Sequence, residues 1–336
     1  MPIQSREIRL VSRPEGLPSA ANFSLETIEL PDPAPGEIQV RNQWMSVDPY
    51  MRGRMRDVPS YVPPFQLGKA LEGGAVGTVV KSNHEGFAPG DTVASFFGWR
   101  EAFNAPGNLP VQALQKVDTT HLAPEAYLGV AGVPGLTAYV AMLNIAKIKE
   151  GDVAFISSAA GAVGSVACQI AKLKGATVIG SAGGKEKCDY LRSIGVDQVI
   201  DYKADPNLTA ALKQAAPKGI DVYLDNVGGT HLEAALIAAR PFARFAMCGM
   251  IASYNGAGTP VRNLENIVGK RLRLEGFIVS DHFNLLPQFY QEVAGWLRSG
   301  KLTATQTVDH GIANAPAAFL KLFSGENIGK MLVKLD

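Results

Sequence analysis

Residues 130–300 alternate between short apolar runs and amphipathic stretches, and this alternation constrains the fold more than any other feature of the sequence. The runs DVAFISS, ATVIGS, QVIDY, GIDVYLDNV and RFAMCGM have the length and composition of buried strands. Between them, stretches such as VGSVACQIAKLKG carry apolar residues three and four positions apart, as helices do. Strands and helices that alternate in this way form a parallel sheet with right-handed crossovers. We therefore predict a doubly wound α/β domain over residues 129–299.

The turn after the first of these strands has the spacing of a dinucleotide-binding loop. The spacing is Ala159-x-Gly161-x-x-Gly164, with alanine in the first glycine position. Gly161 would let the backbone approach a pyrophosphate, and Gly164 would let the following helix pack closely against the strand. The N-terminus of that helix would then face the phosphates. We therefore expect a Rossmann domain that binds a dinucleotide.

The second strand of this domain ends without the carboxylate that usually binds the ribose hydroxyls of NAD. Ser181 occupies the expected position, and AGGKEK follows it. The missing carboxylate leaves room for the 2′-phosphate of NADP, and Lys185 and Lys187 bring positive charge to it. On charge alone, both lysines could equally be solvated residues in the first turn of the next helix. The sequence favours NADP(H) over NAD(H) as the cofactor.

The chain has a different character before about residue 125. Short strand-like runs such as EIQVRNQWMSV and GGAVGTVV are separated by prolines and glycines, which prevent long helices. This pattern predicts an all-β, barrel-like domain. The terminal run KMLVKL has no partner strand near it in sequence, so we expect it to return to this domain. The predicted first domain comprises residues 1–128 and 300–336.

The composition is that of a soluble globular protein. The 336 residues are 46% hydrophobic and 19% charged, and the net charge of +1 provides no overall field to attract nucleic acid or a membrane. No apolar run is long enough to span a bilayer, and the N-terminus lacks the apolar core of a signal peptide. The three cysteines are far apart, which is typical of a reducing compartment. We expect a cytoplasmic protein that binds neither nucleic acid nor membrane.

Several motifs make the chain resemble the zinc-independent medium-chain dehydrogenase/reductases, in the branch of prostaglandin reductases, alkenal double-bond reductases and bacterial curcumin reductases. The resemblance covers essentially the whole chain. It implies a GroES-like β-barrel catalytic domain together with the Rossmann domain. It also implies a homodimer that pairs edge strands of the Rossmann sheets, with RFAMCGM at that edge. The motifs are WMSVDPYMRGRM (44–55), VPGLTAY (133–139), the stretch 158–187, DNVGG (225–229), CGMIASYN (248–255), EGFIV (275–279) and ENIGKMLVKL (326–335).

The resemblance also implies which residues bind the cofactor. Lys187 and Tyr202 match the 2′-phosphate ligands of the family, and Asn226 would lie at the carboxyl end of a strand, where ligands bind in open parallel sheets. The pyrophosphate would meet the backbone of Gly161, Ala162, Val163 and Gly164. The residues that match the nicotinamide and ribose lining are Thr137, Cys248, Gly249, Met250, Ile251, Ser253, Tyr254, Phe277, Ile278, Val279 and Asn327.

The sequence predicts no metal site. Relatives with catalytic zinc carry a cysteine near the start of the barrel domain and a Gly-His-Glu motif after it. Ser46 or Val47 stands at the cysteine position here, and Lys69 stands near the expected histidine. The structural zinc lobe needs four closely spaced cysteines, and none precedes Cys168. The five histidines are scattered singly.

Without a Lewis acid, hydride transfer from NADPH to the β-carbon of an enone remains feasible. The developing enolate needs a hydrogen-bond donor, and the α-carbon then needs a proton. A tyrosine hydroxyl can serve both needs, and the candidates are Tyr254, Tyr50 and Tyr61. Each of them could instead be a packing residue, which is the commoner role of tyrosine.

The leading hypothesis is therefore an NADPH-dependent reductase of α,β-unsaturated aldehydes and ketones. An NADPH:quinone oxidoreductase is an alternative, because quinones are vinylogous enones and accept a hydride in the same geometry. A protein that binds NADPH without turnover is a second alternative. Arg52, Arg54 and Arg56 form a short basic run that either attracts an acidic substrate or is a solvated loop.

Overall fold

The computed structural model describes residues 2–335, which form two compact units. Unit 1 contains the chain up to Leu128 and again from Gln306, and unit 2 contains Gly129–Thr305. The sequence-based division puts residues 300–305 in the first domain, whereas here they belong to unit 2. The reason is a pair of contacts with Gln169: its Nε2 donates to the Thr303 carbonyl at 3.0 Å, and its Oε1 accepts from the Thr303 N–H at 2.8 Å.

Unit 2 is built on a six-stranded sheet with the strand order β10-β9-β8-β11-β12-β13, in which all neighbours are parallel. The order reverses between β8 and β11, which is the topological switch point of a doubly wound sheet. The predicted Rossmann fold is confirmed. The strands are β8 (Val153–Ile156), β9 (Thr177–Ala182), β10 (Gln198–Asp201), β11 (Ile220–Asp225), β12 (Ala239–Met247) and β13 (Arg273–Gly276).

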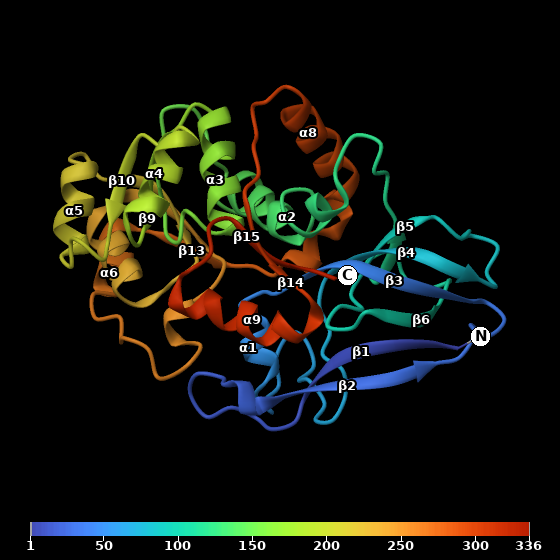
Figure 1. Ribbon diagram of the computed structural model, residues 1–336. Helices are drawn as coiled ribbons and strands as arrows, with labels where there is room; N and C mark the ends of the chain where they lie inside the picture. Colours follow the sequence, from blue (N-terminus) through green and yellow to red (C-terminus); the bar gives the residue numbers. More distant parts are fainter. Residues whose placement is uncertain (1, 336) are drawn as a thin grey trace. The chain divides into compact units, whose positions relative to one another are not determined.

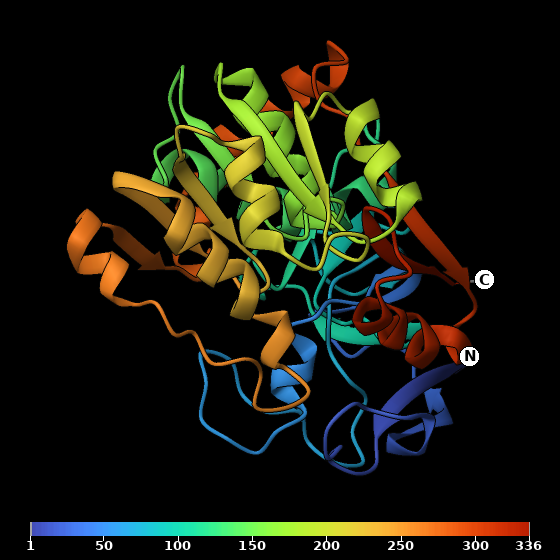
Figure 2. The ribbon, with the colours of Figure 1, turned by 90° about the vertical axis from the view of Figure 1, so that its left-hand side faces the viewer.

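Helices cover both faces of this sheet (Figures 1 and 2). Fully buried aromatic residues lie between the layers, and Phe155 of β8 stacks on Tyr223 of β11 with 5.2 Å between ring centroids. Burial of each such side chain stabilises the fold by about 1.5–3 kcal/mol. The helices are α2 (Val133–Tyr139), the π-helix η3 (Val140–Ile145), α3 (Ala162–Leu173), α4 (Lys185–Ser193), α5 (Leu208–Ala215), α6 (Gly229–Ala238), η4 (Ile251–Ser253), α7 (Glu265–Lys270), η5 (Val279–Leu285) and α8 (Leu286–Arg298).

The sheet of unit 2 ends at β13 and not at β12. Strand β12, which contains the RFAMCGM run up to Met247, is paired on both sides, with Asp225 of β11 and with Gly276 of β13 opposite Met247. The expectation that RFAMCGM lies at the sheet edge is therefore wrong. The edge strand β13 has the sequence RLEG, in which a single apolar residue gives no strand signal.

In the described residues of unit 1, β-strands predominate, with two short α-helices and three short 3₁₀ helices. Its seven-stranded sheet has the order β14-β15-β3-β4-β5-β7 with β6 paired to β3, and β1 and β2 form a separate two-stranded sheet. The terminal strand β15 is antiparallel to β3, with Leu332 opposite Ser46. The strands are β1 (Ile3–Leu10), β2 (Phe23–Leu30), β3 (Glu37–Ser46), β4 (Ala75–Ser82), β5 (Thr92–Ser95), β6 (Ala102–Pro106), β7 (Leu114–Lys116), β14 (Gln306–His310) and β15 (Lys330–Lys334). The helices are η1 (Ala20–Asn22), α1 (Met51–Arg54), η2 (Pro124–Leu128), η6 (Ile312–Asn314) and α9 (Ala315–Ser324).

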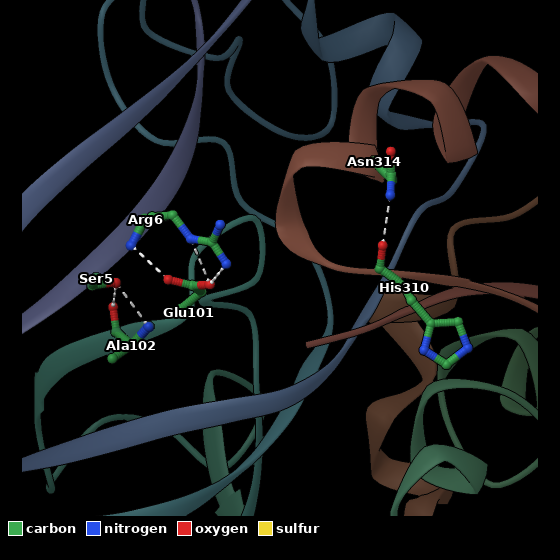
Figure 3. A network of polar contacts seen from close by, with 6 residues as sticks. All are labelled: Ser5, Arg6, Glu101, Ala102, His310 and Asn314. Carbon is green, nitrogen blue, oxygen red and sulfur yellow. Dashed lines mark hydrogen bonds and ion pairs between the residues drawn. The ribbon is translucent and has the colours of Figure 1, made fainter. Parts of the chain in front are cut away.

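Polar contacts join β1 to the larger sheet of unit 1 (Figure 3). The Arg6 backbone N–H and its Nε each donate to the Glu101 carboxylate at 2.9 Å. Beside this pair, the Ser5 hydroxyl exchanges two hydrogen bonds with the Ala102 backbone, at 2.9 and 3.1 Å. Burial opposes the charge of Glu101, but the hydrogen bonds from Arg6 outweigh it and hold the pKa of Glu101 below its usual value.

Within residues 2–335, no helix is long and apolar enough to cross a membrane.

Candidate functional site

Strand β8 leads into α3 through residues 157–161, where the sequence predicts the pyrophosphate site. Gly161 caps α3 in an extended conformation, with φ −84°. A Cβ at Gly164 would lie 2.3 Å from the Ser158 carbonyl oxygen, so α3 can approach the turn this closely only with glycine there. The first N–H groups of α3 have no acceptor within the helix and are available to an anion. The local geometry therefore fits the dinucleotide-binding motif.

Strand β9 ends in Ser181 and Ala182, and neither is a carboxylate. The Ser181 side chain is fully buried, and its Oγ lies 2.8 Å from Nε2 of His231 in α6. The Ser181 side chain is thus directed at α6, whereas the spacing predicts a ribose-facing residue at this position. Side chains alternate between the two faces of a strand, so a count that is wrong by one residue turns the side chain away from the ligand.

Positive charge gathers at the turns after β9 and β10, where α4 and β10 lie side by side (Figure 1). The Lys187 side chain is half-buried, and burial together with the nearby charge of Lys203 lowers the pKa of Lys187. A Cβ at Gly183 would lie 2.9 Å from both the Tyr202 hydroxyl and Cε of Lys203. Among the ion pairs of residues 2–335, none involves Lys187 or Lys203. The cluster of Lys187, Tyr202 and Lys203 thus carries two positive charges that no ion pair within residues 2–335 neutralises.

Two acidic residues near this cluster, Asp189 and Asp201, have other partners. Asp189 forms an ion pair with the exposed Lys185 one helical turn away, so Lys185 does not bring free charge to the cluster. The Asp201 carboxylate accepts the backbone N–H groups of Gly184 at 2.9 Å and of Lys203 at 3.0 Å. These hydrogen bonds lower the pKa of Asp201. Asp201 therefore shapes the turn, and its carboxylate forms no ion pair with the two lysines of the cluster.

The DNVGG motif organises the end of β11. The side-chain amide of Asn226 donates to the Ser157 carbonyl at 2.8 Å, and its backbone N–H bonds to the Ser157 hydroxyl at 2.9 Å. Asp225 is fully buried, and its Oδ1 accepts the N–H groups of Val227 at 2.9 Å and Gly228 at 2.7 Å. Burial raises the pKa of Asp225. These contacts tie β8 and β11 together at the switch point, where doubly wound sheets bind ligands.

Residues 248–254 form the turn that follows β12. The N–H groups of Cys248 and Gly249 both donate to the Asp225 carbonyl at 2.9 Å. A Cβ at Gly249 would lie 3.1 Å from the Tyr254 hydroxyl, so this hydroxyl folds back over its own turn. Burial raises the pKa of Tyr254, while a hydrogen bond with the Met250 backbone opposes the rise. Cys248, Gly249, Met250, Ile251, Ser253 and Tyr254 are therefore brought together in one compact turn.

The other candidates of unit 2 differ in their surroundings. Thr137 is buried, and its hydroxyl donates to the Val133 carbonyl within α2 at 2.7 Å. Phe277, Ile278 and Val279 directly follow β13 and are half-buried. The turns after β8, β9, β11, β12 and β13 all follow carboxyl ends of parallel strands, so they line one edge of the sheet of unit 2. Thr137 lies outside this series.

Unit 1 carries three predicted residues: Tyr50, Tyr61 and Asn327. Tyr50 precedes α1 and packs against the apolar core of the unit. Burial first, and then the charge of Asp48, raise the pKa of Tyr50, and Tyr61 is close enough to contribute to the rise. Tyr61 is 61% exposed. The Asn327 side-chain amide donates to the Gly329 carbonyl at 3.0 Å, which holds the turn before β15.

Two family models match the chain, one described as the N-terminal domain of oxidoreductase over residues 6–113 and one described as zinc-binding dehydrogenase over residues 162–298. The chain is 38% identical to the NADPH-dependent curcumin reductase of Escherichia coli, over 99% of this chain and 97% of that protein. It is also 38% identical to the NADP(+)-dependent 2-alkenal reductase of Nicotiana tabacum, over 99% of this chain and 98% of that protein. The chain belongs to the medium-chain dehydrogenase/reductase family.

A solved structure extends this result to three dimensions. The crystal structure of CurA from Vibrio vulnificus in complex with NADPH matches with a TM-score of 0.93 at 38% identity, over 98% of this chain and 99% of that chain. The similarity spans both units of this medium-chain dehydrogenase/reductase. The fold and family membership implied by its motifs are therefore confirmed.

Two of the residues predicted to stand at or near zinc-ligand positions, Ser46 and Lys69, can be described by their surroundings. The Ser46 hydroxyl, at the end of β3, donates to the Asp48 carboxylate. Lys69 lies exposed on a turn. Within residues 2–335, no group of three or more His, Cys, Asp or Glu side chains is arranged to hold a metal ion.

Two of the three arginines in the basic run after Tyr50 have structural contacts within unit 1. Arg52 is buried, and its Nη2 donates to the Gly16 carbonyl at 2.7 Å. Arg54 donates to the Pro63 carbonyl at 2.9 Å and forms an ion pair with Glu72 at 2.8 Å. Both guanidinium groups hold loops in place, so the hypothesis that this run is a solvated loop does not describe them.

One buried charge in unit 1 is absent from the sequence-based candidates. Lys330 begins β15 and is 5% exposed. Its ammonium donates to the carbonyls of Val47 at 2.8 Å and Met331 at 2.9 Å, and to Asp48 Oδ1 at 3.0 Å. The signal in the sequence is a lysine at the head of the apolar run MLV, because such a residue must find partners if it is buried.

Proposed function

We propose that this protein is an NADPH-dependent reductase of the C=C bond of α,β-unsaturated aldehydes and ketones, and that it needs no metal. The observation that carries the proposal is the cluster of Lys187, Tyr202 and Lys203, whose lysines form no ion pair within residues 2–335, next to a strand that ends without a carboxylate. A 2′-phosphate would supply the missing negative charge and accept hydrogen bonds from all three groups. The relatives named for curcumin and 2-alkenal reduction support the substrate class.

Most of the remaining cofactor contacts are proposed along the same edge of the sheet of unit 2; Thr137 in α2 and Asn327 in unit 1 are the exceptions. The free N–H groups of Ala162, Val163 and Gly164 would bind the pyrophosphate at the start of α3. When bound, NADPH supplies the hydride. The proposed nicotinamide and ribose lining comprises Thr137, Asn226, residues 248–254 (among them Cys248, Gly249, Met250, Ile251, Ser253 and Tyr254), Phe277, Ile278, Val279 and Asn327.

The proposed hydrogen-bond donors to the substrate carbonyl are tyrosine hydroxyls. Burial raises the pKa values of Tyr254 and Tyr50, so both hydroxyls keep their protons at neutral pH. A protonated hydroxyl can donate a hydrogen bond to the developing enolate oxygen. It can also pass a proton through water to the α-carbon. Tyr61 is exposed and is proposed to orient the substrate.

We further propose that two copies of the chain pair through β13, the edge strand of unit 2. Two exposed apolar residues near this edge support the pairing, Phe242 at 67% exposure and Val268 at 79%. Exposed apolar side chains beside an open sheet edge favour association. Sedimentation velocity of Phe242→Asp/Val268→Asp should show a monomer where the parent protein shows a dimer. A cytoplasmic location is also proposed, which the three unpaired cysteines support.

The experiment that tests the function is oxidation of NADPH by the purified protein, followed by the loss of its near-ultraviolet absorbance. The acceptors are 2-nonenal, 3-nonen-2-one, curcumin and a 1,4-quinone, each also measured with NADH. Turnover of alkenals and enones with NADPH, and far less with NADH, is the expected result. Turnover of the quinone alone would make the protein a quinone oxidoreductase. NADPH binding without turnover of any acceptor would indicate a protein that binds NADPH but does not catalyse its oxidation.

A further inference from the structure

Lys330 is a buried lysine whose hydrogen-bonding capacity is fully used. An ammonium group has three N–H donors, and here they bond to the Val47 carbonyl, the Met331 carbonyl and the Asp48 carboxylate. Two of the three acceptors lie in the short connection between β3 and α1. The lysine therefore fastens the start of β15 to this connection inside unit 1.

Asp48 has both of its carboxylate oxygens in the same network. Oδ1 accepts from Lys330 at 3.0 Å, and Oδ2 accepts from the hydroxyl of Ser46, the last residue of β3. The Asp48 carbonyl accepts the Met51 N–H at 3.1 Å, which starts α1. The chain Ser46–Asp48–Lys330 thus fixes the backbone path that ends at Tyr50.

The backbone of Lys330 adjoins the turn that carries a second candidate functional residue, Asn327. Lys330 directly follows the turn of residues 326–329, in which the Asn327 amide bonds to the Gly329 carbonyl at 3.0 Å. This turn is held to β14 by the Thr307 hydroxyl, which donates to the Ile328 carbonyl at 3.0 Å. One buried side chain therefore connects the turn that carries Tyr50 with the turn that carries Asn327.

We propose that the Lys330–Asp48 pair is a positioning device that keeps Tyr50 and Asn327 in a fixed spatial relation for enone reduction. The inference rests on the proposed function. A buried ion pair is a poor stabiliser compared with apolar residues of similar volume, so stability alone does not account for it. Because all three N–H donors of Lys330 are bonded, the directions of these hydrogen bonds restrict the positions of the two turns that they connect. A catalytic donor misplaced by about 1 Å costs on the order of 100-fold in rate.

The test compares Asp48→Asn with Asp48→Ala. Both variants remove the charge, but asparagine keeps an oxygen for Lys330 and a polar atom for Ser46. We expect Asp48→Asn to keep a kcat for 3-nonen-2-one close to that of the parent protein, and Asp48→Ala to lower it about 100-fold. Equal kcat values for the two variants would overturn the proposal. The matched control is Asp309→Ala, which breaks the Asp309–Lys321 ion pair elsewhere in unit 1 and should leave kcat unchanged.

A second variant and a second measurement cover a failure of Asp48→Ala to fold. Lys330→Met/Asp48→Asn removes the ion pair while keeping the side-chain volumes, and it should also lose kcat; full activity would refute the proposal. Hydrogen exchange of the Met51 and Gly53 amides, which bond to residues 48 and 50, should be faster in the double variant than in Asp309→Ala. Unchanged exchange would contradict the positioning role, whether or not the parent protein reduces enones. A parent protein that reduces no enone would, by that result alone, refute only the proposed function.

Discussion

The Ser181 hydroxyl oxygen lies 2.8 Å from Nε2 of His231, and both residues are buried in unit 2. The His231 ring also meets the Tyr202 ring edge-on, with 5.3 Å between centroids. One buried imidazole thus supports the strand end that lacks a carboxylate and the tyrosine proposed to bind the 2′-phosphate. The proposed 2′-phosphate site therefore rests on buried packing as well as on the charges of Lys187 and Lys203.

The stability of unit 2 should depend on pH through His231. Burial lowers the pKa of His231 to about 4 from the ordinary value of 6.5, so the folded state holds the ring neutral. Between these values only the unfolded state binds the proton, and the unfolding free energy should fall as the pH falls from about 6.5 to about 4. The loss should be on the order of 3 kcal/mol, since one pKa unit corresponds to about 1.4 kcal/mol.

Urea unfolding of the parent protein and of His231→Phe across this pH range checks the expectation. The variant should lose the fall in stability toward acidic pH, although its buried Ser181 hydroxyl is left without a partner and lowers the stability at every pH by about 1–3 kcal/mol. Exposed His121 provides the control, and His121→Gln should keep the parent profile. A variant His231→Phe with an unchanged profile would contradict the assignment.

Lys187→Ala should weaken the binding of NADPH and leave that of NADH unchanged. A hydrogen bond to a charged group contributes about 1.5–3 kcal/mol, so KM for NADPH should rise roughly 10- to 100-fold. Lys185→Ala is the matched control, because Lys185 lies two residues away on the same helix and is paired with Asp189. Steady-state kinetics with both cofactors give the ratio. An equal change for NADPH and NADH would place Lys187 outside the phosphate site.

Two glycine substitutions should affect different properties, Gly183→Ala the binding of NADPH and Gly164→Ala the thermal stability. At Gly183, a Cβ would meet the flexible ends of Tyr202 and Lys203, which can move aside, so Gly183→Ala should fold normally and bind NADPH more weakly. At Gly164, a Cβ would lie 2.3 Å from the Ser158 carbonyl oxygen, which cannot move without displacing the turn. Gly164→Ala should therefore lower the melting temperature strongly. Thermal unfolding with and without 2′,5′-ADP separates the two effects; similar melting temperatures for both variants would contradict the argument.

Tyr254→Phe should lower kcat for an enone about 100-fold and leave KM for NADPH nearly unchanged, because loss of one donor to a developing oxyanion costs about 100- to 1,000-fold. The substitution removes only the hydroxyl that lies over Gly249 and keeps the ring. Tyr190→Phe, which removes a buried hydroxyl from α4, controls for a general effect of losing a tyrosine hydroxyl. Full kcat in Tyr254→Phe would assign the donor role to another residue.

Regular alternation made the Rossmann unit predictable, because buried parallel strands and amphipathic helices each impose their own period on the sequence. Strand β13 was not predictable, since RLEG carries one apolar residue and is recognised only by its neighbour β12. Side chains alternate between the two faces of a strand, so the face on which Ser181 lies changes if its position is miscounted by one residue. Counting residues from the glycine motif is not accurate to one residue. Lys330 was missed because its partners, at residues 47 and 48, are far away in sequence.

The buried carboxylate of Asp225 allows a last prediction. Its Oδ1 accepts the Val227 and Gly228 N–H groups, whereas its Oδ2 is buried without a hydrogen bond among residues 2–335. Burial raises the pKa of Asp225, so folding favours the protonated form. The charged form therefore destabilises the native state above the folded-state pKa, and the penalty disappears as the pH falls toward the ordinary carboxyl value.

Asp225→Asn should be at least as stable as the parent protein at neutral pH, because its amide oxygen still accepts both N–H groups and no charge is buried. Its advantage should shrink as the pH falls to about 4, near the ordinary pKa of an aspartate. Taking the difference between variant and parent cancels the contribution of His231 where the two sites act independently. Asp225→Ala, which leaves both N–H groups without an acceptor, should be less stable than Asp225→Asn by about 1–3 kcal/mol at every pH. Urea unfolding at several pH values measures both differences, and an advantage of Asp225→Asn that grows toward acidic pH would show that the carboxylate is charged and stabilising in the native state.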